Sequence, residues 1–418
     1  MNLLLQNVHH KDLAGEKDIL IVDGTIHEIS KRIEPKSEYE IINLKGKLVT
    51  YGWFDLHSDF ADPGFEYRED ILSGGRLASS SGFTDVCVLP YLSPVTDTKS
   101  SIQYVKRKAA EVVPSLHVVA NLSKGGKAED LSEMYDLWES GAAYFMDTVP
   151  ISNAELLLKA LEYTQRFDGV VASIPLEESL ARFGLVHEGA VSTSLGLRGI
   201  PHIAETAAIK RDLEVLSYGG GKLHFAGISY AESVKLISDA KDRGMNVTCD
   251  VSIHNLMFAD DEMLPFDTSY KTRPVLREQE DKKALIDGVK SGTIDAIASY
   301  HIPRSTEEKD LEFDLADFGI ISLQTMFPNL LRLSESLAMD SIEEKISNGP
   351  RAILGLPQIA IEKGAEAKLS VFDTEEIWMY DSKSNLSKSK NSPFFNQELK
   401  GRCLGVVNGN KTNLLTDV

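Results

Sequence analysis

The chain has 418 residues, of which 42% are hydrophobic and 26% charged, a composition typical of a globular protein. Its 63 acidic and 44 basic side chains give a net charge of −19, which repels polyanions and argues against a nucleic-acid partner. No apolar run reaches the roughly 18 residues that a membrane span requires, so we expect no membrane partner. The N-terminal MNLLLQNVHHKD lacks the basic start and apolar core of a signal peptide, and we expect a cytoplasmic protein.

The first 50 residues predict short strands and turns. Residues 17–29 contain a strand, the turn Asp23-Gly24 and a second strand, which is a hairpin signal. Residues 41–50 predict another strand pair around Lys45-Gly46.

The C-terminal segment also predicts short strands and turns. Strands are expected at 367–373, 376–381 and 401–412, and the polar stretch 382–394 between them predicts a surface loop. We therefore expect residues 1–50 and 362–418 to combine into one small β-sandwich, because chain termini often lie close together.

Residues 51–361 alternate between strand and helix. The eight strand candidates are 53–60, 84–89, 116–122, 142–147, 169–175, 222–229, 246–253 and 295–302. Helical runs follow several of them, at 100–113, 153–167, 231–244 and 280–292. This pattern predicts an α/β fold, a (β/α)8 TIM barrel. A doubly wound open sheet is the alternative, but no Gly-x-Gly-x-x-Gly follows the first strand.

Chemistry in such a barrel lies where the strands end. In DLHSDFADPG, residues 55–64, His57 and Asp59 have the period-two spacing that places two side chains on one side of a strand. The fourth strand ends at Asp147. We take His57, Asp59 and Asp147 as candidate metal ligands. One imidazole and two carboxylates suit Mg²⁺ or Ca²⁺ better than a catalytic zinc ion.

The other strand ends offer little to a metal. They carry Ile174, Gly227, Asp250, His254, Asn255 and the pair Tyr300-His301. Tyrosine is a poor general base near neutral pH, with an ordinary pKa of about 10. We interpret His224 and His254 as structural. The cysteines Cys87, Cys249 and Cys403 form no Cys-x-x-Cys pair, and we expect free, buried thiols.

Several segments together resemble the dihydroorotase family of the amidohydrolase superfamily. HSDFADPG is similar to its His-x-His-x-Arg-x-Pro-Gly motif, and GLRGIPHIAETAAIKRDLEV to its characteristic helix. ALIDGVKSGTIDAIASYHIP is similar to its Gly-Thr-Ile-Asp…Asp-His-x-Pro-His segment, and NGPRAILGL to its closing region. The resemblance covers nearly the whole chain. It implies a zinc-dependent enzyme of pyrimidine synthesis that interconverts carbamoyl aspartate and dihydroorotate.

The same resemblance implies that most of the chemistry has been lost. His57 matches the first histidine of the motif, but these residues replace the expected functional groups: Asp59, Ala61, Tyr91, Ile174, Gly227, Arg273, Tyr300 and Arg304. Tyr300 stands where the catalytic Asp is expected, so we assign no catalytic residue. Arg273 and Arg304 are candidate substrate-binding residues, and we expect these arginines to pair with Asp59 or Asp147 where a metal would otherwise lie.

Three functions follow from this interpretation. The first is an inactive dihydroorotase-like protein with a structural or regulatory role, a homodimer partnering aspartate carbamoyltransferase as inactive homologues do, and with no cofactor. The second is an active amidohydrolase on a cyclic amide, with zinc in an atypical site. The third is a sensor whose Arg273 and Arg304 hold a carboxylate or phosphate.

Overall fold

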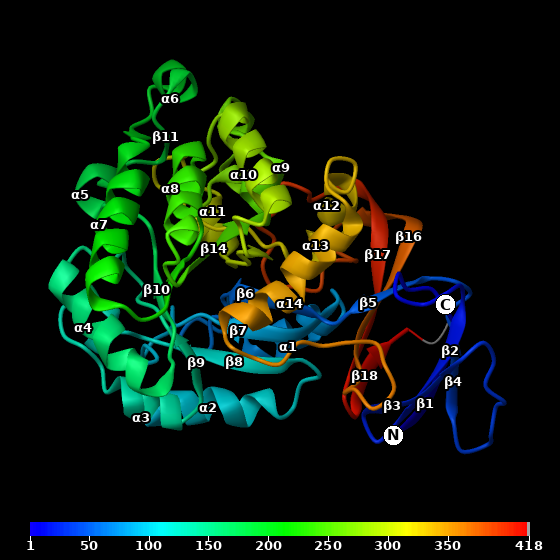
Figure 1. Ribbon diagram of the computed structural model, residues 1–418. Coiled ribbons are helices and arrows are strands. Elements are labelled where there is room, and N and C mark those ends of the chain that lie inside the picture. The colour runs from blue at the N-terminus through cyan, green and yellow to red at the C-terminus, as the bar shows by residue number, and fades with distance from the viewer. Residues whose placement is uncertain (416–418) are drawn as a thin grey trace.

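The computed structural model describes residues 1–415 and contains the predicted barrel (Figure 1). Its parallel strands lie in the order β15-β14-β13-β10-β9-β8-β7-β6. Their bounds are β6 (Trp53–Ser58), β7 (Phe83–Val88), β8 (Ser115–Ala120), β9 (Ala142–Phe145), β10 (Val171–Ser173), β13 (Leu223–Phe225), β14 (Val247–Ser252) and β15 (Ala296–Ala298). All eight strands predicted from the sequence are therefore confirmed.

The barrel closes between its last and first strands. His301, just after β15, forms a parallel bridge with Ser58, and its carbonyl accepts a hydrogen bond from the Asp59 N–H at 2.9 Å. Every residue of β6 is buried, as expected for a strand covered on both faces.

Helices surround the strands (Figure 1). They are α1 (Ile71–Ser79), α2 (Lys99–Ala109), α3 (Met134–Glu139), α4 (Ala154–Thr164), α5 (Glu178–Ala181), α6 (Ala190–Leu195), α7 (Ile203–Gly219), α8 (Ala231–Asp242), α9 (Ile253–Met257), α10 (Gln279–Ser291), α11 (Thr306–Lys309), α12 (Met326–Leu333), α13 (Met339–Ile346) and α14 (Asn348–Ile353). The Thr98 hydroxyl caps α2, and Gly292 ends α10 in a left-handed conformation. None of the described helices is long and apolar enough to cross a lipid bilayer.

Strands from both chain ends form two further sheets, with orders β3-β2-β1-β4 and β18-β17-β16-β5. Their bounds are β1 (Asn2–Val8), β2 (Lys17–Val22), β3 (Thr25–Ser30), β4 (Glu40–Asn43), β5 (Leu48–Tyr51), β16 (Lys368–Tyr380), β17 (Gln397–Asn408) and β18 (Lys411–Leu414); the short β11 (Val186–His187) and β12 (Gly199–Ile200) pair separately. The two sheets share one apolar core, in which Leu5 and Ile19 lie with Leu369 and Val407.

The predicted pairing of the two strands around Lys45-Gly46 is wrong. β4 pairs with β1 in one sheet, whereas β5 pairs with β16 in the other. The turn at Lys45 and Gly46 moves the chain from one layer of the sandwich to the other, because it joins β4 directly to β5.

The stretch predicted as a surface loop is largely anchored. We call residues 381–396 the strap. Its Ser387, Ser389 and Asn391 are less than 10% exposed. The Ser387 hydroxyl donates to Glu69 at 2.6 Å, and Asn391 Nδ2 donates to the Ile302 carbonyl at 2.9 Å. Serine and asparagine side chains of the strap form hydrogen bonds with buried backbone and carboxylate groups of the barrel. The polar composition of the segment therefore predicted a surface loop, although these polar side chains are buried.

Candidate functional site

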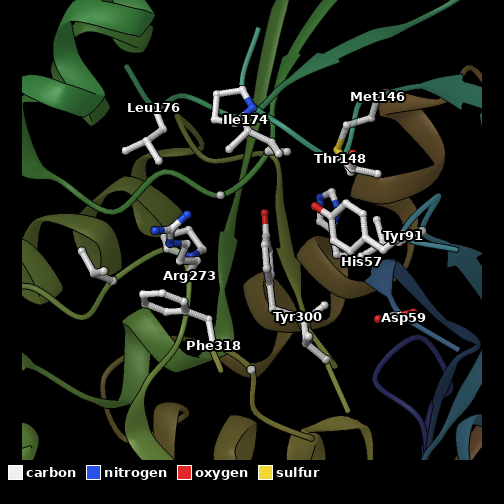
Figure 2. Close-up of a pocket in the computed structure, with 18 of the residues that line it drawn as sticks. His57, Asp59, Tyr91, Met146, Thr148, Ile174, Leu176, Arg273, Tyr300 and Phe318 are labelled. Atoms are coloured by element: carbon white, nitrogen blue, oxygen red, sulfur yellow. The ribbon is translucent and has the colours of Figure 1, made fainter. Parts of the chain in front are cut away.

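A pocket of about 580 Å³ opens among the carboxyl ends of the barrel strands (Figure 2). His57 of β6, Ile174 after β10, Gly227 after β13 and Tyr300 after β15 all line it. This is the end of a TIM barrel at which binding and chemistry are found, and the volume suits a small organic ligand.

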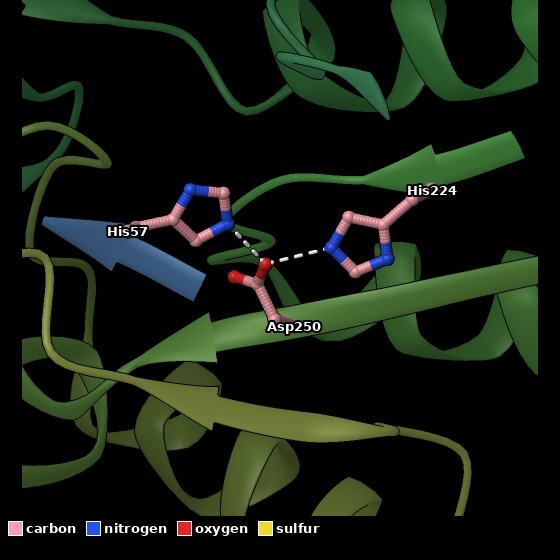
Figure 3. Close-up of side chains that lie close together, drawn as sticks. All are labelled: His57, His224 and Asp250. Carbon is pink, nitrogen blue, oxygen red and sulfur yellow. Dashed lines mark hydrogen bonds and ion pairs between the residues drawn. The ribbon is translucent and has the colours of Figure 1, made fainter. Parts of the chain in front are cut away.

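His57 belongs to a buried network centred on Asp250 of β14 (Figure 3). Asp250 Oδ2 lies 2.5 Å from His57 Nε2 and 2.8 Å from His224 Nε2. Its other oxygen, Oδ1, accepts from the Tyr300 hydroxyl at 2.9 Å and from the Gly227 N–H at 3.0 Å. Four protein donors therefore occupy one carboxylate that is 0% exposed.

The charge state of this network follows from its geometry. Burial alone would raise the pKa of Asp250, but His57 and His224 hold that pKa well below its usual range. An ionised carboxylate can only accept hydrogen bonds, so both ring nitrogens that face it must carry hydrogens. A histidine nitrogen that carries a hydrogen cannot ligate a metal ion. In this arrangement the Nε2 atoms donate to Asp250, whereas a metal site would need their lone pairs free.

The same three side chains are a group that could hold a metal ion, with ligand atoms within 4.8 Å of one another. Zinc bound tetrahedrally at 2.0–2.1 Å would keep its ligand atoms about 3.3 Å apart. The observed 2.5 and 2.8 Å are hydrogen-bond distances. Zinc would have to spread the group apart, and each imidazole would have to carry its hydrogen on Nδ1.

Tyr300 fills the space that a side chain at position 227 would need. A Cβ built on Gly227 would lie 2.5 Å from the Tyr300 hydroxyl and 2.7 Å from Pro274 Cγ. Gly227 also has a φ of +78°, which disfavours other residues. A ligating histidine at position 227 and a tyrosine at position 300 therefore exclude each other.

The structure does not bring together the three metal ligands predicted from the sequence. β6 ends at Ser58, so Asp59 lies outside the strand and its side chain need not point to the same side as that of His57. Asp59 Oδ1 accepts a hydrogen bond from the Ala61 N–H at 2.8 Å. Asp147 accepts from the N–H of Ser123 at 2.9 Å and from its hydroxyl at 2.6 Å. Of the predicted three, only His57 belongs to the group around Asp250.

One of the two candidate arginines forms the expected ion pair. Arg304 Nη1 lies 3.9 Å from Asp59 Oδ2, and its Nε donates to the Phe318 carbonyl at 3.1 Å. Burial raises the pKa of Asp59 to about 6, because Arg304 offsets only part of the desolvation. Arg273 pairs with neither carboxylate, and its guanidinium instead stacks on the Phe318 ring at 4.3 Å.

Sequence reasoning placed His224 among structural residues and missed its contact with Asp250. The pairing register of the two strands indicates this contact, because His224 of β13 pairs with Thr248 of β14. Asp250 is two residues further along β14 and points to the same side. His254 and His301 are buried, and burial lowers the pKa of His254 to about 4 and that of His301 to about 3.

A second group of possible ligands joins His187, Asp260 and the exposed Glu278. Arg277 Nη1 donates to His187 Nδ1 at 3.0 Å, so the hydrogen of the neutral ring lies on Nε2. Burial, followed by the charge of Arg277, lowers the pKa of His187 to about 4, which keeps the ring neutral. The Nε2–H faces Glu278 at 3.9 Å as a donor, which does not suit a metal ligand.

Sequence comparisons point to one family, and a structural comparison supports the fold. The dihydro-orotase-like family model matches residues 46–233. The dihydroorotase of Geotalea daltonii is 39% identical, with 92% of this chain and 91% of that protein aligned; the dihydroorotase of Geobacter metallireducens is also 39% identical, with 98% and 99% aligned. Among solved structures, the L-hydantoinase (dihydropyrimidinase) from Arthrobacter aurescens has a TM-score of 0.85 at 20% identity. The alignment covers 99% of this chain and 96% of the hydantoinase.

Proposed function

Since this chain belongs to the dihydroorotase family, we propose that it is a homologue within pyrimidine biosynthesis that has lost metal-dependent hydrolysis and keeps its barrel for a structural or regulatory role. The observation that carries this proposal is the saturation of Asp250 by His57, His224, Tyr300 and the Gly227 N–H. A two-zinc centre does not fit these residues.

The lost acid–base group supports the same proposal. Tyr300 stands where the family carries its aspartate, and burial raises the pKa of Tyr300 far above its ordinary value of 10.0. A phenol that stays protonated and donates to Asp250 cannot take a proton from water. Loss of proton transfer alone typically costs about 10²- to 10⁴-fold in rate.

The second candidate is an active amidohydrolase with an atypical zinc site. The proximity of the His57, His224 and Asp250 ligand atoms, all within 4.8 Å, favours it. It requires both imidazoles to carry their hydrogens on Nδ1, so that Nε2 is free to bind the metal.

One experiment separates the two candidates: zinc content of the purified protein, measured alongside dihydroorotate hydrolysis. We expect substoichiometric zinc and no turnover, with the Geobacter metallireducens dihydroorotase as the positive control. Stoichiometric zinc with turnover, both abolished by His224→Ala, would replace the first candidate with the second.

The proposed role includes a partner. Inactive members of the family serve as structural partners of aspartate carbamoyltransferase, and we extend that role, a homodimeric state and a cytoplasmic location to this chain. Size-exclusion chromatography with light scattering tests the dimer. Co-purification with aspartate carbamoyltransferase from the native cell tests the partner, and a monomer that elutes apart from that enzyme would contradict this part of the proposal.

A further inference from the structure

We propose that the pocket at the strand ends binds an organic monoanion with an apolar or aromatic body, an arylalkanoate or a ligand of the same kind, whose carboxylate meets Arg273. This goes beyond the proposed function, because it concerns binding and requires no catalysis. Three features of the described residues carry it: apolar walls, polar groups that the protein itself occupies, and one uncommitted arginine.

The walls of the pocket are mainly apolar. Its lining includes Leu89, Met146, Ile174, Leu176, Ile302 and Phe318. Figure 2 shows Ile174 and Leu176 on the same rim as Arg273, with Tyr300 between Arg273 and His57. Burying a ligand against such walls yields about 25 cal/mol for each Å² of apolar surface.

Polar groups in the pocket are mostly occupied by the protein itself. The Tyr300 hydroxyl donates to Asp250, and the Thr148 hydroxyl donates to the Gly126 carbonyl at 3.0 Å. A ligand rich in amide groups would leave its own donors and acceptors unpaired, which costs free energy. The pocket therefore favours an apolar body over a hydrophilic one.

Arg273 is the arginine of the pocket that remains available. Arg68 is paired with Glu308, Arg277 with Glu205, and Arg304 with Asp59 and Asp317. Within residues 1–415, Arg273 makes no hydrogen bond or ion pair, and its side chain is exposed in the pocket.

The stacking of Arg273 on Phe318 fixes the guanidinium plane while leaving its N–H groups open. A planar guanidinium with free donors matches a carboxylate in a two-bond arrangement.

Arg273 is the arginine of the pocket that forms no ion pair with a described residue. The pocket lining contains four arginines, Arg68, Arg273, Arg277 and Arg304, and three carboxylates, Asp59, Glu205 and Asp317, and Glu308 pairs with Arg68 from outside the lining. The three paired arginines are therefore neutralised by their partners, while Arg273 keeps a positive charge that attracts an anion. One uncommitted arginine matches one carboxylate, hence a monoanion.

The test uses isothermal titration calorimetry of the full chain with 4-phenylbutyrate and with its neutral isostere 4-phenylbutanamide. We expect the carboxylate to bind at least about tenfold more tightly, since charge-assisted hydrogen bonds contribute about 1.5–3 kcal/mol. Arg273→Met should remove this preference and leave amide binding unchanged. The control, Arg32→Met, changes an arginine whose side chain is 80% exposed and lies outside the pocket. Ile174→Asn should weaken both ligands alike.

Three results would overturn the proposal: equal affinity for acid and amide, an Arg273→Met protein that keeps the preference, or tighter binding of N-carbamoyl-aspartate than of 4-phenylbutyrate. Thermal melting of each variant shows that a loss of binding is not a loss of fold. Zinc content and turnover are measured separately, so failure of this proposal and failure of the proposed function give different results.

Discussion

Tyr300 combines an unusual backbone conformation with a hydrogen bond from its hydroxyl to a buried carboxylate. Its φ is +50°, a left-handed value that costs a bulky residue about 1–3 kcal/mol. The hydroxyl bond to ionised Asp250 compensates for this cost. Tyr300→Phe removes a donor from a buried charge, and we expect it to lower the free energy of unfolding by about 1.5–3 kcal/mol.

Urea denaturation followed by circular dichroism measures this loss. Tyr144→Phe is the matched control, because its hydroxyl donates to the neutral Leu56 carbonyl at 3.0 Å and we expect a loss of about 1 kcal/mol. A Tyr300→Phe protein no less stable than the control would show that Asp250 does not need the tyrosine.

Asp59 makes stability depend on pH. Its pKa is raised from 3.8 to about 6 in the folded protein, so its contribution to stability is present below pH 3.8 and is lost as the pH rises through 6. Asp59→Asn cannot ionise. We expect this variant to be about 2–3 kcal/mol more stable than the wild type at pH 8 and equally stable at pH 4. Asp23→Asn, at a carboxylate whose side chain is 84% exposed, should show no such difference.

The same titration should modulate anion binding. Asp59 gains its negative charge as the pH rises through 6, and this charge lowers the electrostatic potential around Arg304 and in the pocket. The affinity for 4-phenylbutyrate should therefore fall between pH 5 and pH 7 in the wild type and stay level in Asp59→Asn. Calorimetry at these two pH values checks the expectation, and an equal fall in both proteins would contradict it.

At the scale of elements, the strap positions one side of the pocket. Asn391 Oδ1 accepts from the Arg304 N–H at 3.1 Å while its Nδ2 donates to the Ile302 carbonyl. Asn391→Ala leaves both backbone groups without a partner, and we expect a loss of about 2 kcal/mol and faster amide exchange around residues 302–304. Lys390→Ala, at the adjacent exposed residue, is the control and should change neither. Unchanged exchange in Asn391→Ala would show that the strap does not hold the rim.

The elements that periodicity encodes could be predicted from the sequence, and those that depend on distant contacts could not. The eight buried strands and their helices could be predicted because each depends on the spacing of apolar residues within its own segment. The partner of β5 is β16, more than 300 residues away, so the turn at Lys45 gave no information about pairing. The buried contacts of the strap escaped prediction for the same reason, since its serines bond barrel residues far away in sequence.

The location of the candidate site at the strand ends was predicted from the sequence, and the loss of metal-dependent chemistry stays a prediction. The absence of ligands at Ile174 and Gly227 was visible in the sequence, as was the pairing of an arginine with Asp59. The network around Asp250 was not predicted, because it needs the register of β13 on β14 and the closure of the barrel, which brings His57 of β6 to the same carboxylate.

For the whole molecule, the question is whether barrel and sandwich behave as one unit. Phe372 of β16 stacks on Trp53 of β6 at 4.4 Å, and Asn408 of β17 donates to the Thr84 carbonyl at 3.1 Å. Beneath the barrel, the buried carboxylate of Asp85 joins the two parts. These contacts should make unfolding a single cooperative transition.

Asp85 holds three positively charged or protonatable partners. Lys368 Nζ of β16 and His117 Nε2 each lie 3.0 Å from its oxygens, and Arg351 of α14 donates to Oδ2. Burial alone would raise the pKa of Asp85, but His117, Lys368 and Arg351 hold it well below its usual range. The stability that this carboxylate supplies is therefore present at neutral pH and is lost only as the pH falls below about 4.

Asp85→Asn would leave Lys368 and Arg351 as buried cations without a countercharge, a change that typically costs about 3–5 kcal/mol. Because Lys368 belongs to the sandwich and Asp85 to the barrel, we expect the variant to unfold in two steps, with tryptophan fluorescence and far-ultraviolet circular dichroism no longer coincident in urea. The wild type and the exposed-site control Asp23→Asn should keep coincident curves at pH 7. Coincident curves in Asp85→Asn, with a loss under 1 kcal/mol, would mean that the apolar contact of Phe372 with Trp53 couples the two parts without the buried charges.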